Sequence, residues 1–177
     1  MKYVALFRGI NVGGKAKVPM LQLKEMFEGL GLANVVTYIN SGNVLFEDDR
    51  KVLELEPLIE KAFAKEFGFP VRIVLRTAAS IAKICREIPD DWTNDGEQKT
   101  DVMFLWPEID NKDVLNKVVI NPELENVRYI EGALVWNIGR ENVTRGGGVK
   151  LIKTNLYPLM TIRNINTVRK LNELLNS

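Results

Sequence analysis

Two glycine-rich segments flanked by basic residues have the composition of anion-binding loops. The first runs Arg8-Gly-Ile-Asn-Val-Gly-Gly-Lys15, and the second runs Thr144-Arg-Gly-Gly-Gly-Val-Lys150. Between a strand and a helix, the N–H groups of such a loop and the helix N-terminus can cradle a phosphate. The first segment fits neither the Walker spacing nor the fingerprint Gly-x-Gly-x-x-Gly. Glycine clusters also form plain turns and connectors, so both interpretations stay open.

The candidate ligand-binding residues come from these two segments, from the polar turn Asn40-Ser-Gly-Asn43 and from the dipeptide at 163–164. They are Arg8, Asn11, Gly13, Gly14, Lys15, Asn40, Ser41, Arg145, Lys150, Arg163 and Asn164. The turn offers amide and hydroxyl groups, although turns favour the same residues for backbone reasons. Asn164 is a suitable N-cap for a final helix. Arg163 is the preferred single candidate, because a cation at a helix start opposes the helix dipole unless an anion or carboxylate compensates it.

The basic residues are segregated along the chain. The 24 basic and 23 acidic residues nearly balance, yet residues 1–24 and 142–172 contain eleven of the basic residues and no acidic one. The rest of the chain has 13 basic against 23 acidic residues. If the two stretches meet in space, they form a positive patch that attracts anions. The alternative is two separate solvated faces.

Several kinds of chemistry are excluded by residue type. The chain has no histidine and one cysteine, Cys85, so it contains no imidazole base and no protein-only zinc site. Burial in a helical segment is the default interpretation for Cys85. We expect Asp48-Asp49 to form a solvated turn, so the sequence predicts no metal, and it leaves the identity of any cofactor unknown. Any proton transfer would have to use Glu, Asp, Lys or Tyr, and no spacing identifies a catalytic residue.

The elements that must position these residues follow from periodicity. Strands are expected at 3–8, 35–39, 44–47 and 71–75, with helices from Pro19 to about Gly29 and through Leu55–Phe67. The resulting order, β-α-β-β-α-β, is ferredoxin-like. A helix over 77–88 and a linker at 89–98 precede a strand at 101–106, a short helix capped by Asn111 and a hairpin at 127–136. A short helix at 149–157, ended by Pro158, and a last helix capped by Asn164 complete the prediction.

The two hairpins resemble each other, since Tyr-Ile, a glycine turn and an apolar strand occur in both. This suggests a duplicated unit. The predicted organisation is therefore an α+β fold with a ferredoxin-like half at 1–77, a connecting helix and linker at 78–99, and a second, related and incomplete α+β half at 100–177. The apolar runs are too short for a membrane span or a signal peptide, so we expect a cytoplasmic protein without membrane contact.

Three motifs in their order along the chain resemble the bacterial DUF1697 family. They are Arg8-Gly-Ile-Asn-Val-Gly-Gly, Tyr38-Ile-Asn-Ser-Gly-Asn and Thr161-Ile-Arg-Asn. The resemblance spans essentially the whole chain. It implies an α+β fold with a ferredoxin-like half and a cytoplasmic bacterial protein. It implies no activity, cofactor or catalytic residue, so no role is transferred to a position of this chain.

Three functions are compatible with these patterns. The first is binding of a small phosphorylated or carboxylated ligand, by an enzyme or a binding protein. The second is RNA binding, with Tyr3, Phe7 and Phe46 as stacking candidates, although these are more simply core residues and a pI near 7.8 lies below the range above about 9 that favours nucleic-acid readers. The third is a protein-interaction module without a ligand. The sequence leaves the oligomeric state open.

Overall fold

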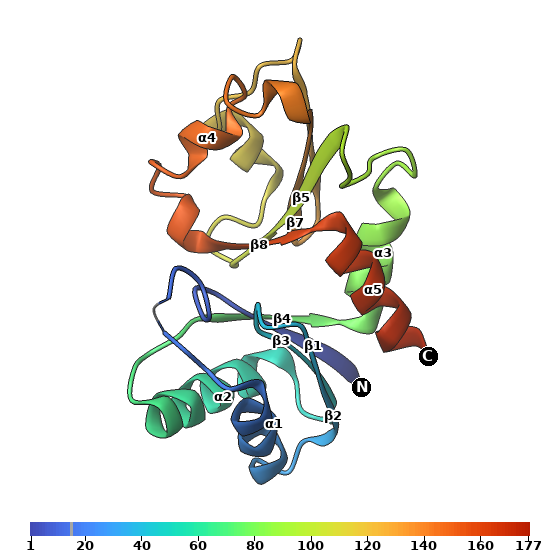
Figure 1. Cartoon of the computed structure of the whole chain (residues 1–177). Coiled ribbons are helices and arrows are strands. Elements are labelled where there is room, and N and C mark those ends of the chain that lie inside the picture. The colour runs from blue at the N-terminus through green and yellow to red at the C-terminus, as the bar shows by residue number, and fades with distance from the viewer. Residues whose placement is uncertain (15) are drawn as a thin grey trace. The chain divides into compact units, whose positions relative to one another are not determined.

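The computed structural model describes residues 1–14 and 16–177, which form two compact units (Figure 1). The first unit contains residues 1–79 together with 173–177, and the second contains residues 80–172. Each unit is built on a four-stranded antiparallel sheet. The α+β fold class predicted from the sequence is confirmed.

The first unit has the ferredoxin-like topology. Its strands lie in the order β2-β3-β1-β4. The elements are β1 (Lys2–Phe7), α1 (Met20–Gly29), β2 (Ala33–Tyr38), β3 (Asn43–Glu47), α2 (Val52–Phe67) and β4 (Ile73–Thr77). They agree with the expected elements to within two residues at most ends.

Both helices of this unit cover one face of the sheet (Figure 1). Alternate residues of β1, among them Tyr3 and Phe7, point into this core because successive strand residues face opposite sides. Phe7 packs against Phe27 of α1 and Phe63 of α2, with ring centroids 6.1 and 5.4 Å apart. Tyr3, Phe7 and Phe46 are each only 1% exposed, so all three RNA-stacking candidates are core residues.

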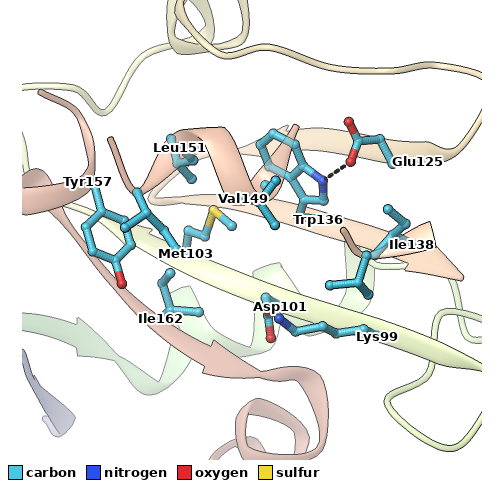
Figure 2. A pocket seen from close by; sticks show the side chains of 13 residues that line it. Lys99, Asp101, Met103, Glu125, Trp136, Ile138, Val149, Leu151, Tyr157 and Ile162 are labelled. Atoms are coloured by element: carbon cyan, nitrogen blue, oxygen red, sulfur yellow. Dashed lines mark hydrogen bonds and ion pairs between the residues drawn. The ribbon is translucent and has the colours of Figure 1, made fainter. Parts of the chain in front are cut away.

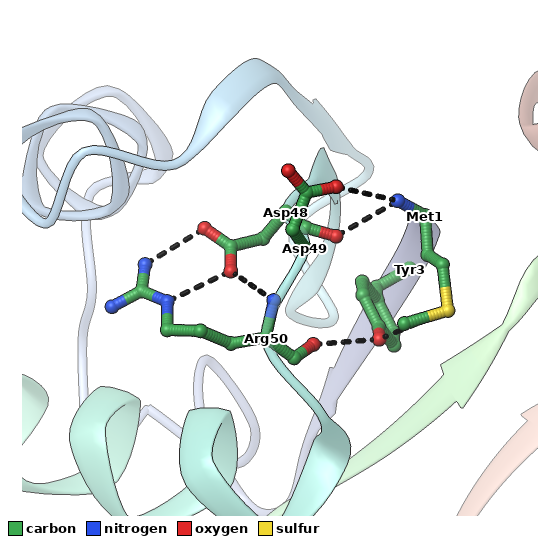
Figure 3. A network of polar contacts seen from close by, with 5 residues as sticks. All are labelled: Met1, Tyr3, Asp48, Asp49 and Arg50. Atoms are coloured by element: carbon green, nitrogen blue, oxygen red, sulfur yellow. Dashed lines mark hydrogen bonds and ion pairs between the residues drawn. The ribbon is translucent and has the colours of Figure 1, made fainter.

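The turn after β3 is held by ion pairs (Figure 3). The Asp48 carboxylate accepts two bonds from the Arg50 guanidinium, each 2.7 Å, and one from the Arg50 backbone N–H at 2.8 Å. The Arg50 side chain lowers the pKa of Asp48 to about 2. Asp49 lies 3.8 Å from the Met1 amino group. The Asp48 carboxylate thus binds Arg50, and the Asp49 carboxylate lies near the Met1 amino group instead. The two carboxylates do not act as a pair.

The second unit repeats the strand order of the first. Its sheet runs β6-β7-β5-β8, in which each strand occupies the place of its counterpart in β2-β3-β1-β4. Its strands are β5 (Gln98–Leu105), β6 (Glu125–Ile130), β7 (Ala133–Gly139) and β8 (Met160–Asn164). Short 3-10 helices η1 (Lys112–Lys117), η2 (Arg140–Asn142) and η3 (Tyr157–Leu159), with α4 (Gly148–Leu151), stand where the first unit has long helices. The expected second, related and incomplete half is confirmed at the level of strand order.

Two further helices belong mainly to the second unit, α3 (Ala78–Glu87) and α5 (Ile165–Asn176). They lie side by side on the side of the sheet opposite α4 (Figure 1), and the Cys85 sulfur is 3.9 Å from the Val168 carbonyl oxygen. Burial raises the pKa of the Cys85 thiol, in keeping with a structural cysteine. The prediction of a single helix over residues 149–157 is wrong. It is two separate turns, α4 and η3, and Pro158 lies inside η3, where its missing N–H is not needed.

Candidate functional site

The first glycine-rich loop forms a hollow of about 420 Å³ at the start of α1. The hollow is lined by Asn11, Gly14, Lys17, Val18, Pro19, Met20 and Asn40. Three residues predicted to bind a ligand, Asn11, Gly14 and Asn40, are therefore brought together. Lys17 also lines the hollow and was missed, although it belongs to the basic stretch that the sequence singled out. Lys15 lies outside the described residues.

The side chain of Asn11 holds this loop to the hairpin turn. Its amide nitrogen donates to the carbonyl oxygens of Val18 and Asn40, each at 2.9 Å, and its Oδ1 accepts from the Val18 N–H at 2.7 Å. Asn11 adopts φ 55°, a left-handed conformation that asparagine tolerates better than most residues. The amide therefore fixes the wall of the hollow through both of its ends.

The electrostatics of the hollow favour an anion. The first helical bond of α1 runs from the Leu23 N–H to the Pro19 carbonyl at 3.0 Å, so the N–H groups of residues 20–22 lie outside the helical ladder. Pro19 is the N-cap and makes no side-chain capping bond, and the first turn contains no acidic residue. Lys17 is exposed beside this N-terminus. The helix dipole and the ammonium group have the same sign at this point.

The turn Asn40-Ser-Gly-Asn43 packs beneath the loop. Gly42 has φ 78°, and a Cβ there would lie 2.6 Å from Ile10 Cδ1 and 2.7 Å from Phe7 Cβ. The Phe7 N–H donates to the Gly42 carbonyl at 2.9 Å. The Asn43 amide donates to the Tyr38 carbonyl and to the Ser41 hydroxyl, each at 3.0 Å. These bonds give the motif a structural role in closing the hairpin, and Ser41 does not line the hollow.

The second glycine cluster binds an anion that belongs to the chain itself. The Glu125 carboxylate accepts the Gly147 N–H at 2.8 Å, the Asn121 N–H at 2.7 Å and the Trp136 Nε1–H at 2.8 Å. A Cβ on Gly147 would lie 1.7 Å from the Val119 carbonyl oxygen. Glycine is required there by close packing. The Gly147 N–H is thus engaged by an internal carboxylate, while Arg145 and Lys150 are exposed beside it.

The remaining candidates, Arg163 and Asn164, end β8. Asn164 caps α5, because its Oδ1 accepts the Thr167 N–H at 3.0 Å, as expected. Arg163 is only 7% exposed, and its guanidinium donates to Thr161 Oγ1 at 3.1 Å and to the Ile162 carbonyl at 2.8 Å. Burial lowers the pKa of Arg163 to about 10, so it stays charged at neutral pH.

The four candidates Arg145, Lys150, Arg163 and Asn164 belong to the second unit, whereas Arg8 and the loop residues belong to the first. The backbone N–H of Arg8 donates to the Arg72 carbonyl at 3.2 Å, and Arg8 is not among the residues that line the hollow. The meeting of the two basic stretches stays a prediction.

A second cavity, of about 330 Å³, was missed by sequence analysis. It lies in the second unit between one face of the sheet and the segment that carries α4 and η3 (Figure 2). Met103, Trp136 and Ile162 form its floor, and Val149 and Ile152 reach its mouth with 39% and 59% exposure. The available signal was the apolar pair Val149 and Ile152, which lies in a segment whose apolar residues do not follow helical spacing. Sequence analysis treated this segment as part of a short helix.

No described group of three or more Asp, Glu or Cys side chains is arranged to hold a metal ion. Among the helices formed by residues 1–14 and 16–177, none combines the length and the apolar character that crossing a membrane requires. The cytoplasmic location expected from the sequence stays a prediction.

The comparisons with known proteins agree with the fold. Residues 1–136 match the protein family described as "Protein of unknown function (DUF1697)". The structure is similar to that of the conserved bacterial protein SP0830 from Streptococcus pneumoniae, with a TM-score of 0.84, 29% sequence identity and coverage of 98% of each chain. A search of curated proteins gives no match. The family match covers most of the chain, and all three motifs are present, so the chain belongs to the DUF1697 family.

Proposed function

We propose that this protein binds a small phosphorylated or carboxylated molecule in the hollow at the N-terminus of α1. The observation that carries the proposal is the composition of that hollow. Lys17, the N-cap Pro19 and Met20 at the uncapped start of α1 line it, and none of the described residues that line it is acidic. An anion there would be stabilised by the charge of the Lys17 ammonium group, by the helix dipole and by hydrogen bonds from backbone N–H groups that lie outside the helical ladder.

The loop is also built to hold its shape. Asn11 is bonded to Val18 and to Asn40 of the hairpin turn, so these three positions are already ordered before a ligand binds. At Gly13 and Gly14, with φ 61° and 73°, an ideal Cβ would have no atom within 4 Å among the described residues beyond the chain neighbours. Their backbone is therefore open to close approach by a ligand.

The RNA-binding alternative has less support. Its stacking candidates Tyr3, Phe7 and Phe46 are buried beneath the helices of the first unit, where they contact other core side chains. Base stacking needs an exposed ring face. Short RNA nonetheless belongs in the binding screen, because its phosphates could occupy the same hollow.

A thermal-shift screen at low salt tests the proposal. Inorganic phosphate, sugar phosphates, nucleotides and dicarboxylates should include a compound that raises the melting temperature of the wild-type protein. At about 100 times its dissociation constant, a ligand adds roughly 2.7 kcal/mol, which is on the order of 5 to 10 °C for a chain of this size.

Two variants locate the effect. Lys17→Gln should abolish most of the shift, whereas Lys24→Gln should keep it, since Lys24 pairs with Glu28 on α1 and does not line the hollow. If no compound shifts either the wild type or the variants, the loop is scaffold and the search turns to protein partners.

A further inference from the structure

The cavity of the second unit has a firm apolar floor. Met103 of β5 pairs with Leu134 and Ile162 in neighbouring strands, and Trp136 lies opposite Asp101. The indole is fixed in place because its Nε1–H donates to the buried Glu125 carboxylate at 2.8 Å (Figure 2). Val149, Leu151 and Tyr157 close the cavity from the other side. The floor of the cavity is therefore already in place before a ligand binds.

The mouth of this cavity exposes apolar surface. Val149 and Ile152 are among the exposed large hydrophobic residues of the chain, and both line the cavity. A preformed, mostly apolar hollow with a few polar groups at one end is typical of small-molecule sites. At roughly 30 Å³ for each water-sized group, the cavity holds on the order of ten non-hydrogen atoms.

The polar groups restrict the charge of an occupant. At one end, Lys99 Nζ lies 3.2 Å from Asp101 Oδ2, and their side chains are 40% and 20% exposed. Glu125 is the third acidic or basic side chain in the lining, and its oxygens already accept three N–H bonds. Lys99 and Asp101 compensate one another, and the Glu125 carboxylate is stabilised by its three N–H partners, so neither an anion nor a cation finds an uncompensated opposite charge among the described lining residues. A group that accepts from Lys99 and donates to Asp101 suits both partners.

The geometry points to a second binding site, in this cavity, for an uncharged and mostly apolar small molecule that carries one hydroxyl or amide group. The apolar body lies between Trp136 and Val149, and the polar group reaches the pair formed by Lys99 and Asp101. This site lies wholly within the second unit and does not depend on the anion site of the first. Its ligand class also differs, because it is neutral.

Three probes with the same body separate the chemical classes. 2-Naphthol, 2-naphthoate and 2-naphthylmethylamine share a fused two-ring body and are neutral, anionic and cationic at pH 7. Titration of the full chain by calorimetry, with ligand-observed NMR for weak binding, should rank 2-naphthol at least tenfold tighter than either charged probe. Tighter binding of a charged probe, or no saturable binding of 2-naphthol, would overturn the proposal.

A glycine substitution places the binding in the cavity. Gly148 lines the cavity, and an ideal Cβ there is in ordinary contact with the Trp136 ring, at 3.8 Å. Gly148→Leu therefore adds its side chain beside the indole, where we expect it to occupy ligand space. The variant should lose at least tenfold in 2-naphthol affinity. Gly29→Leu is the matched control, because its Cβ position is open and it lies in the first unit. Equal loss in both variants, or none in Gly148→Leu, contradicts the assignment.

A second variant tests the polar end without altering the cavity shape. Asp101→Asn removes one of the two carboxylates, so the preference should move toward 2-naphthoate by a measurable factor. An unchanged ratio of the 2-naphthol and 2-naphthoate affinities in a variant that melts like the wild type would show that the polar group does not contact this pair. Phosphate binding governed by Lys17 is measured separately, so failure of one site does not decide the other.

Discussion

The side-chain amide of Asn11 donates to the backbone carbonyl of Asn40 at 2.9 Å, across 29 residues of sequence. This bond joins the glycine-rich loop to the hairpin turn, which contain two of the three motifs that the chain shares with the DUF1697 family. The same amide also closes the loop on Val18. The two motifs are therefore joined by hydrogen bonds into one local structure, which shapes the hollow at α1.

Loss of the Asn11 side chain should destabilise the connection between the loop and the hairpin turn. Asn11→Gly keeps the left-handed backbone conformation and removes all three bonds, so we expect the free energy of unfolding to fall by about 2 kcal/mol. Urea unfolding followed by circular dichroism measures it. Asn11→Asp, which keeps only an acceptor for the Val18 N–H, should lose a similar amount. A loss within experimental error in both variants would show that the loop is held by other contacts.

Gly42 should tolerate a side chain less well than Gly68. Gly42→Ala combines an unfavourable φ of 78° with contacts of 2.6 and 2.7 Å to Ile10 and Phe7. Gly68→Ala has the same strain at φ 79° and open space around it. We expect a loss of about 1 kcal/mol at Gly68 and at least about 2 kcal/mol more at Gly42, from urea midpoints. Equal losses would mean that the hairpin yields to the added methyl group.

Glu125 should be essential to the fold of the second unit. Glu125→Gln replaces an oxygen that accepts N–H bonds with a group that donates, so at least one buried bond is lost. The expected loss is about 2 to 3 kcal/mol in the free energy of unfolding. Glu123→Gln, two residues away and exposed, should stay within about 0.5 kcal/mol of the wild type. Similar stability of the two variants would contradict the internal-anion interpretation of the second glycine cluster.

The ion pair at Asp48 predicts a dependence of stability on acid. The folded pKa of about 2 lies below the unfolded value near 3.9, so this stabilisation is present above pH 4 and is lost as the pH falls toward 2. Since Arg50 is partly exposed, we expect no more than about 1 kcal/mol. Asp48→Asn should flatten the stability curve between pH 4 and 2 relative to the wild type. A parallel curve for both proteins would exclude the contribution.

Local signals in the sequence were sufficient for the first unit. The apolar stripes through Phe27 and Phe63 and the left-handed Gly68 after α2 follow from residues within a few turns of each other. Asn164 likewise caps α5 through a bond to Thr167, three residues away. Such short-range chemistry can be read without knowing the tertiary structure.

Long-range relationships could not be predicted. Gly147 and Glu125 are 22 residues apart, and nothing in either segment shows that the carboxylate fills the glycine cluster. Arg163 lies beside a helix start, as expected, but it also belongs to β8, where it pairs with Val102 and is only 7% exposed, and this burial could not be predicted. The cavity at Trp136 arises from the second unit having short turns where the first has helices, which periodicity detects only as weak helical signals.

Mapping of phosphate on the backbone tests the anion site most directly. In a titration of ¹⁵N-labelled protein with inorganic phosphate at low salt, we expect saturable amide shifts at Gly13, Gly14, Lys17 and the first turn of α1. Lys17→Gln should weaken them, and Lys24→Gln should not. Shifts confined to Arg145, Lys150 or Arg163, or no saturable shift at millimolar phosphate, would contradict an anion site at α1.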